Sequence, residues 1–200
     1  MATELDIIND CLATMGEVPL NTVAEPHEMK GAILRTLDKQ LEDIQATGWW
    51  FNTDATTLTP DPSGMIYLPG DCLKWQSGVR SKDSLTRTYA KPWLVERGGR
   101  LYDTRNNTYL MTEKVTGEVV RRVPLEDLPA VVNRLVAAAT VLKFQSNYDG
   151  DNNRRAELTT EYRLAKAEAH AENTRQAGVN LLNSNPRLQR IKRVVRQARW

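Results

Sequence analysis

Apolar residues recur every three to four positions in the first and last parts of the chain, on either side of a central region with a different pattern. This period places them on one face of a helix. It predicts helices near residues 3–15, 26–47, 129–147 and 152–176. Thr3 with Asp6 three residues later resembles a capping box, Gly16 is a stop signal, and Pro26 suits a first helical turn.

The central region, residues 49–123, is rich in threonine, tyrosine, tryptophan and valine, and proline and glycine interrupt it at short intervals. This pattern is typical of short antiparallel strands. Two glycines suit a two-residue hairpin turn because its central residues need positive φ angles. We expect strands at 65–68, 73–76 and 118–123, and a hairpin turn at Gly98 and Gly99.

The order of these elements predicts an α+β fold, because helical and strand-rich runs are separate along the chain. Residues 1–48 and 124–178 are expected to form a helical bundle, with residues 49–123 as an inserted antiparallel β-sheet region. Together they would form one domain, 1–178. A linker rich in asparagine, serine and proline then leads into an extended C-terminal arm, 179–200.

The charge of the chain is unevenly distributed. Apolar residues make up 40% and charged residues 26% of the 200 positions, which is enough to bury a core and far from a disordered composition. The net charge is +2, yet residues 173–200 hold seven basic residues and no acid, which leaves the rest at −5. No apolar run approaches the ~18 residues that a membrane span needs, and the N-terminus has no secretory signal pattern. We therefore expect no membrane insertion.

Candidate catalytic groups are few. His27 and His170 lie in predicted helices beside acids and are expected on helix surfaces. Carboxylates spaced three to four residues apart are typical of a solvated helix face, and common nucleotide-binding, metalloprotease and serine-hydrolase motifs are absent. Cys11 and Cys72 have no neighbouring ligands at metal-binding spacing, so we expect reduced cysteines. The sequence predicts neither an enzyme nor a metal or cofactor site.

Two local patterns invite a binding function. Trp49, Trp50 and Phe51 could stack on sugars or bases, but the simpler interpretation is that alternate rings pack into the core where helix meets sheet. Residues 149–153, Asp-Gly-Asp-Asn-Asn, resemble part of a calcium loop but lack its glycine spacing and distal glutamate. This favours a turn between two helices.

Four segments occur in a characteristic order and spacing. They are Ile8-Asn-Asp-Cys-Leu-Ala-Thr-Met-Gly-Glu-Val-Pro, Gly48-Trp-Trp-Phe-Asn, Arg97-Gly-Gly-Arg-Leu-Tyr-Asp-Thr and Pro124-Leu-Glu-Asp-Leu-Pro-Ala. In this order they resemble the tail tubular protein A family of short-tailed phages, from about Leu5 to Asn173. No single segment is a chemical fingerprint.

This resemblance implies a structural virion protein, made in the host cytoplasm and placed where the head meets the tail. The family's arrangement would be a ring of twelve subunits beneath the portal protein, with a nozzle of the tail tubular protein B type attached below. Genomic DNA would pass through the central channel without sequence readout. The resemblance implies no cofactor.

The C-terminal arm is the candidate portal-binding segment, because its apolar residues would share one helix face with arginines around them. Its candidate residues are Arg187, Leu188, Arg190, Ile191, Arg193, Val194, Val195, Arg196 and Trp200. Tryptophan and arginine are common interface anchors, which favours docking on a partner. Two other interpretations stay open: a solvated tail, or contact with DNA phosphates. The second would make the chain a nucleic-acid-binding accessory protein.

Overall fold

Contacts within the chain divide it into two compact units. The structure, a computed structural model, describes residues 1–80, 87–88, 90–149 and 151–176. Met1–Asn52 and Arg122–Asn173 form a unit of helices, here the helical unit, and Thr53–Arg121 belong to a unit of strands, here the β unit. Helices and antiparallel strands occupy separate parts of the sequence, which confirms the predicted α+β class.

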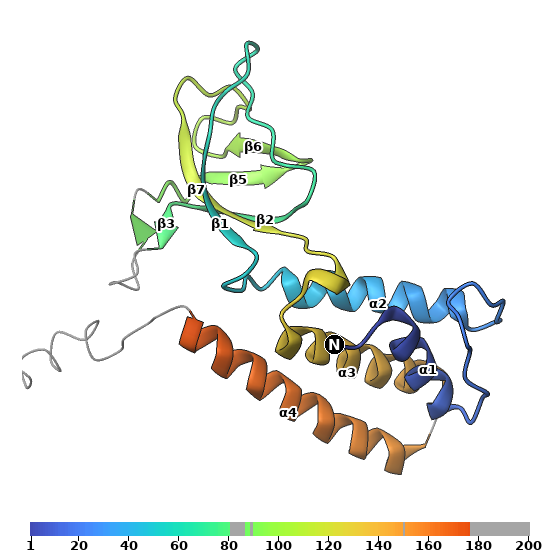
Figure 1. Ribbon diagram of the computed structural model, residues 1–200. Coiled ribbons are helices and arrows are strands. Elements are labelled where there is room, and N and C mark those ends of the chain that lie inside the picture. The colour runs from blue at the N-terminus through green and yellow to red at the C-terminus, as the bar shows by residue number, and fades with distance from the viewer. Residues whose placement is uncertain (81–86, 89, 150, 177–200) are drawn as a thin grey trace, which may run out of the picture. The chain divides into compact units, whose positions relative to one another are not determined.

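The helical unit is organised around one buried helix (Figure 1). Its elements are α1 (Glu4–Thr14), α2 (Lys30–Gln45), the 3-10 turn η1 (Leu125–Asp127), α3 (Ala130–Tyr148) and α4 (Asn152–Gln176). Both α1 and α2 pack on α3, in which Val132, Val136 and Phe144 are fully buried. The apolar stripe of α3 therefore forms the centre of the core, and the four helices lie within a few residues of the predicted ranges.

Local hydrogen bonds set both ends of α1 as the sequence predicts. The Asp6 backbone N–H donates to Thr3 Oγ1 at 3.2 Å, and the Thr3 N–H donates to Asp6 Oδ2 at 2.8 Å, which completes the capping box. At the other end Gly16 has a φ of 72°. This left-handed conformation lets the Glu17 N–H reach the Leu12 carbonyl at 3.1 Å and ends the helix.

The start of the second helix differs from the prediction. α2 begins at Lys30, so Pro26 lies before the helix and not in its first turn. The segment before α2 is held as a turn: His27 Nδ1 accepts from the Met29 N–H at 3.2 Å, and the Lys30 ammonium donates to the Val23 carbonyl at 2.6 Å. These contacts compete with helical bonds and delay the helix by one turn.

The β unit is a set of small antiparallel sheets. Its strands are β1 (Thr53–Leu58), β2 (Cys72–Ser77), β3 (Val79–Arg80), β4 (Arg87–Thr88), β5 (Leu94–Arg97), β6 (Arg100–Asp103) and β7 (Val115–Arg121). In the main sheet β7 lies between β1 and β2, while β3–β4 and β5–β6 are separate pairs. β7 is the most buried strand because it has a neighbour on both edges.

The hairpin prediction is confirmed, but one predicted strand is not formed. Gly98 and Gly99 turn between β5 and β6 with φ angles of 59° and 71°. Residues 65–68 make only an isolated bridge from Tyr67 to Arg100, although the Leu101 N–H donates to the Ile66 carbonyl at 3.0 Å. This segment meets the end of the hairpin and then reaches Pro69, which has no N–H to continue a ladder.

Candidate functional site

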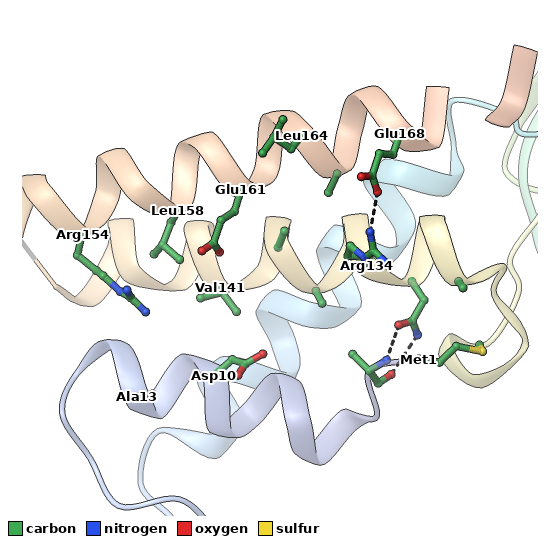
Figure 2. A pocket seen from close by; sticks show the side chains of 16 residues that line it. Met1, Asp10, Ala13, Arg134, Val141, Arg154, Leu158, Glu161, Leu164 and Glu168 are labelled. Atoms are coloured by element: carbon green, nitrogen blue, oxygen red, sulfur yellow. Dashed lines mark hydrogen bonds and ion pairs between the residues drawn. The ribbon is translucent and has the colours of Figure 1, made fainter. Parts of the chain in front are cut away.

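A groove opens between α1, α3 and α4 of the helical unit (Figure 2). Its volume is about 730 Å³. Small side chains form much of its lining, namely Ala13, Ala130, Ala137, Ala138 and Ala165. Because each of these side chains is a single methyl group, the groove has room for larger side chains from another surface.

Two carboxylates line opposite walls of the groove. Asp10 on α1 and Glu161 on α4 both point into the space over Val141 of α3 in Figure 2. Partial burial raises the pKa of Asp10, and the negative charges of Asp6 and Glu161 raise it further. Among the described residues, neither Asp10 nor Glu161 forms an ion pair. The groove therefore holds two carboxylates that form no ion pair within the described residues.

The other charged side chains of the groove are paired. Arg134 Nη1 meets Glu168 Oε2 at 2.7 Å across α3 and α4. Arg154 pairs with Glu157 at 3.1 Å within α4. Both pairs are substantially exposed, so each contributes at most ~1 kcal/mol to stability. Their effect on the groove is to neutralise its ends and leave the acidic charge in its middle.

The helix α4 buries little of its surface. Of its 25 residues, those that are buried are Leu158, Ala165 and Ala169, while the Leu164 side chain is 62% exposed beside the groove. A helix of this length within a closed monomer normally buries a broader apolar stripe. α4 and the groove together thus form a surface that the described part of the chain does not cover.

The β unit carries a second distinctive surface, on the outer face of the β5–β6 hairpin. The guanidinium of Arg97 lies 4.1 Å from the ring centroid of Tyr102, and that of Arg100 lies 4.5 Å from the ring of Tyr109. The two tyrosine rings are 4.8 Å apart in an edge-to-face arrangement. We call these four residues the arginine–tyrosine ladder. Alternation along the hairpin predicts its strand members, but the loop residue Tyr109 is brought in only by the fold.

The histidines and cysteines, which the sequence did not assign to catalysis, lie scattered in the structure. Burial raises the pKa of the Cys11 thiol to about 12 and also raises that of Cys72, so neither is a reactive thiolate. His170 lies exposed on α4 as predicted, with its ring 5.1 Å from that of Trp49, whereas His27 lies in the turn before α2 and not in a helix. In the residues that the structure describes, no cluster of His, Cys, Asp or Glu could hold a metal ion.

The aromatic segment after α2 belongs to the core. Trp49 is 3% exposed, and its indole N–H donates to the Ile44 carbonyl at 2.7 Å. Trp50 and Phe51 are partly buried against the same core, and the Trp50 N–H donates to Asn173 Oδ1 at 3.0 Å. Packing, and not a sugar or base platform, accounts for this segment.

The segment that resembles a calcium loop lies between α3 and α4. Asp149 Oδ1 accepts from the Asp151 N–H at 3.2 Å, and Asp151 Oδ1 accepts from the Asn153 N–H at 2.8 Å. These carboxylates therefore satisfy backbone donors at the start of α4, as expected for a turn between helices.

No helix in the described ranges is long and apolar enough to cross a membrane.

Net charge differs strongly between the parts of the chain. Residues 1–52 and 122–173 hold 17 acidic and 10 basic residues, a net charge of −7, while residues 53–121 carry +2 and residues 174–200 carry +7. Surfaces of opposite charge within one chain favour contacts between copies or with other proteins.

The candidate portal-binding residues, from Arg187 to Trp200, lie outside the described residues.

Comparison with known proteins gives consistent matches. The profile of the tail tubular protein family matches residues 5–179. Tail tubular protein A of Klebsiella phage KP34 is 27% identical over 152 residues, which cover 75% of this chain and 76% of that protein.

Proposed function

Because the chain belongs to the tail tubular protein family, and is thus a structural component of a phage tail, we propose that it is the ring subunit that joins the head portal to the tail. The ring docks beneath the portal, supports the tail nozzle and forms part of the channel through which DNA leaves the head. The family match over residues 5–179 supports a structural role in place of an enzymatic one.

The exposed surface of α4 is the observation that carries the ring proposal. A 25-residue helix that buries three side chains is poorly explained in an isolated subunit, and the groove beside it keeps two unpaired carboxylates. A closed ring needs two different complementary patches on each subunit, because each copy contacts one neighbour on either side. The groove of the helical unit and the surface of the β unit can serve as such patches.

The C-terminal arm is proposed to dock on the portal. Its apolar residues are too few for a core of their own and need a partner surface. Each one that becomes fully buried would contribute ~1.5–3 kcal/mol, more than an exposed ion pair of its arginines. The arm's net charge of +6 supports an alternative function, DNA binding by a nucleic-acid accessory protein.

The ring proposal predicts a change in mass on contact with the portal. The full chain, mixed with purified portal of the same phage, is expected to form one closed ring per portal, which native mass spectrometry and electron microscopy would detect. Twelve copies are expected from the family resemblance. A single copy off the tail axis in particles would contradict the proposal, and binding to DNA fragments without portal binding would favour the accessory function.

Removal of the arm tests the portal contact separately. A chain ending at residue 178 is expected to keep its thermal unfolding profile, because the described helices and strands end before that point. It is also expected to lose portal binding in a pull-down assay. Binding that survives truncation but disappears in moderate salt would place the contact on another charged surface. Failure of the truncated chain to fold would show that the arm is part of the core.

A further inference from the structure

The outer face of the β5–β6 hairpin presents two arginines, each stacked on a tyrosine ring. Arg97 pairs with Arg100 and Val95 with Tyr102 across the hairpin, while Leu94 on the opposite face is buried. This register places both guanidinium groups on the same side of the hairpin. The guanidinium of Arg97 lies 4.1 Å from the centroid of the Tyr102 ring, and that of Arg100 lies 4.5 Å from the centroid of the Tyr109 ring. Stacking fixes the arginine side chains. Arg100 Nη1 donates to Met65 Sδ at 3.4 Å, and the other guanidinium N–H groups of Arg97 and Arg100 have no partner in the described part of the chain.

The composition of this face favours a protein partner over nucleic acid. Neither Arg97 nor Arg100 forms an ion pair with a carboxylate of the described chain. Next to Arg100, the Tyr67 side chain is 56% exposed. Tyrosine and arginine without lysine are typical of protein interfaces, and the β unit's charge of +2 is small for a surface that follows a phosphate backbone. A protein surface that binds this face therefore needs carboxylates to pair with the arginines and space to hold the tyrosine rings.

The groove of the helical unit has these properties. Asp10 and Glu161 supply two carboxylates on opposite walls, and Ala137, Ala138 and Ala165 line the space between α3 and α4. The carboxylates of Asp10 and Glu161 belong to the helical unit, whose net charge is −7. This net charge adds long-range attraction for arginine. The positive charge of the ladder is therefore complementary to the negative charge of the groove.

We propose that the arginine–tyrosine ladder of one copy docks in the α1–α3–α4 groove of a neighbouring copy, with Arg97 and Arg100 paired to Asp10 and Glu161. This inference rests on the proposed ring function and specifies its interface between subunits. The two patches differ and lie on different units, so each copy uses one patch toward each neighbour. Such a heterologous contact can close into a ring when the rotation between copies allows it.

Two charge-reversed variants test the contact. The ladder variant carries Arg97→Glu with Arg100→Glu, and the groove variant carries Asp10→Arg with Glu161→Arg. Each full-length variant alone, mixed with purified portal, is expected to form at least about tenfold less ring than the wild type, because like charges meet at every interface. Native mass spectrometry measures the fraction of subunits in rings.

An equimolar mixture of the two variants is expected to restore ring formation. Acidic ladders then face basic grooves and basic ladders face acidic grooves, so alternating copies attract at every interface. This result cannot arise from a misfolded variant or from a contact within one chain.

Arg105→Glu and Asp43→Arg are the matched controls. Arg105 stacks on Trp93 at 4.1 Å and is not part of the ladder, and Asp43 is exposed on α2. Both are expected to assemble normally.

Three results would overturn the inference or its premise. Rings formed at the wild-type level by either variant alone would overturn the ladder–groove contact while leaving the ring intact. Loss of rings that mixing does not restore would also overturn it, and would assign the ladder to a contact within the chain or to another tail protein. If the wild-type chain forms no ring on the portal, the proposed ring function itself fails.

Discussion

Replacing Gly117 with alanine is expected to destabilise the β unit by about 3 kcal/mol, at the upper end of overpacking effects. A methyl group on Gly117 would lie 2.6 Å from the Gln76 carbonyl oxygen and would overlap the ring of Trp75. Trp75 pairs with Val119 in the β2–β7 register, so its ring lies diagonally across Gly117. The ring is 8% exposed and belongs to the core of the β unit, so it cannot move away without disturbing the sheet.

Hydrogen exchange measured by mass spectrometry would report this effect for each unit separately. Peptides from residues 53–121 are expected to lose protection in Gly117→Ala, while peptides from α1 to α3 keep it. Gly70→Ala is the matched control, because no atom lies within 4 Å of its added methyl group and its φ is not positive. A control and variant with equal stability in chemical denaturation would show that β2 and β7 can separate at little cost.

Replacing Gln45 with leucine is expected to cost the helical unit about 2–4 kcal/mol, although leucine has a similar size. Gln45 is fully buried at the end of α2. Its amide donates to the Val123 carbonyl at 2.9 Å and accepts from the Val123 N–H at 2.8 Å, so one side chain satisfies both backbone groups of that residue. Leucine removes both bonds and leaves a backbone donor and acceptor without their partner.

The control for this variant is Gln40→Leu, on the same helix. Gln40 is half-buried and lines a shallow surface pocket, so the substitution is expected to change the unfolding free energy by less than about 0.5 kcal/mol. Both variants are measured by urea denaturation followed by circular dichroism. If Gln45→Leu were as stable as the control, water would have to replace the amide at Val123.

Short-range features of this protein were predictable from residue types and their spacing. The capping box of Thr3 and Asp6, the stop at Gly16 and the Gly98–Gly99 turn each depend on a few neighbouring residues, and the structure contains all of them. The apolar period gave the positions of the helices for the same reason, since it reflects geometry within one helix. The order of four segments likewise predicted the family to which the chain belongs.

The predicted helix start at Pro26 and the predicted strand at residues 65–68 were wrong, because other hydrogen bonds in the fold replace the expected ones. In the first case contacts from His27 and Lys30 form a turn where the pattern predicted helix. In the second, a strand-like run meets the hairpin only at one bridge. Secondary-structure propensity is a weak preference, and the neighbours supplied by the fold decide which hydrogen bonds form.

The sequence by itself therefore determined the helices and the hairpin, because these depend on contacts between near neighbours. It also determined the class of fold and the family, because these follow from the order of segments along the chain. The tertiary structure alone decided that Gln45 meets Val123, that Trp75 covers Gly117, and that Asp10 and Glu161 share a groove. These partners are separated by between 42 and 151 positions in the numbered chain. No periodic pattern encodes such pairs, since they follow from how apolar faces pack and bring distant polar groups together.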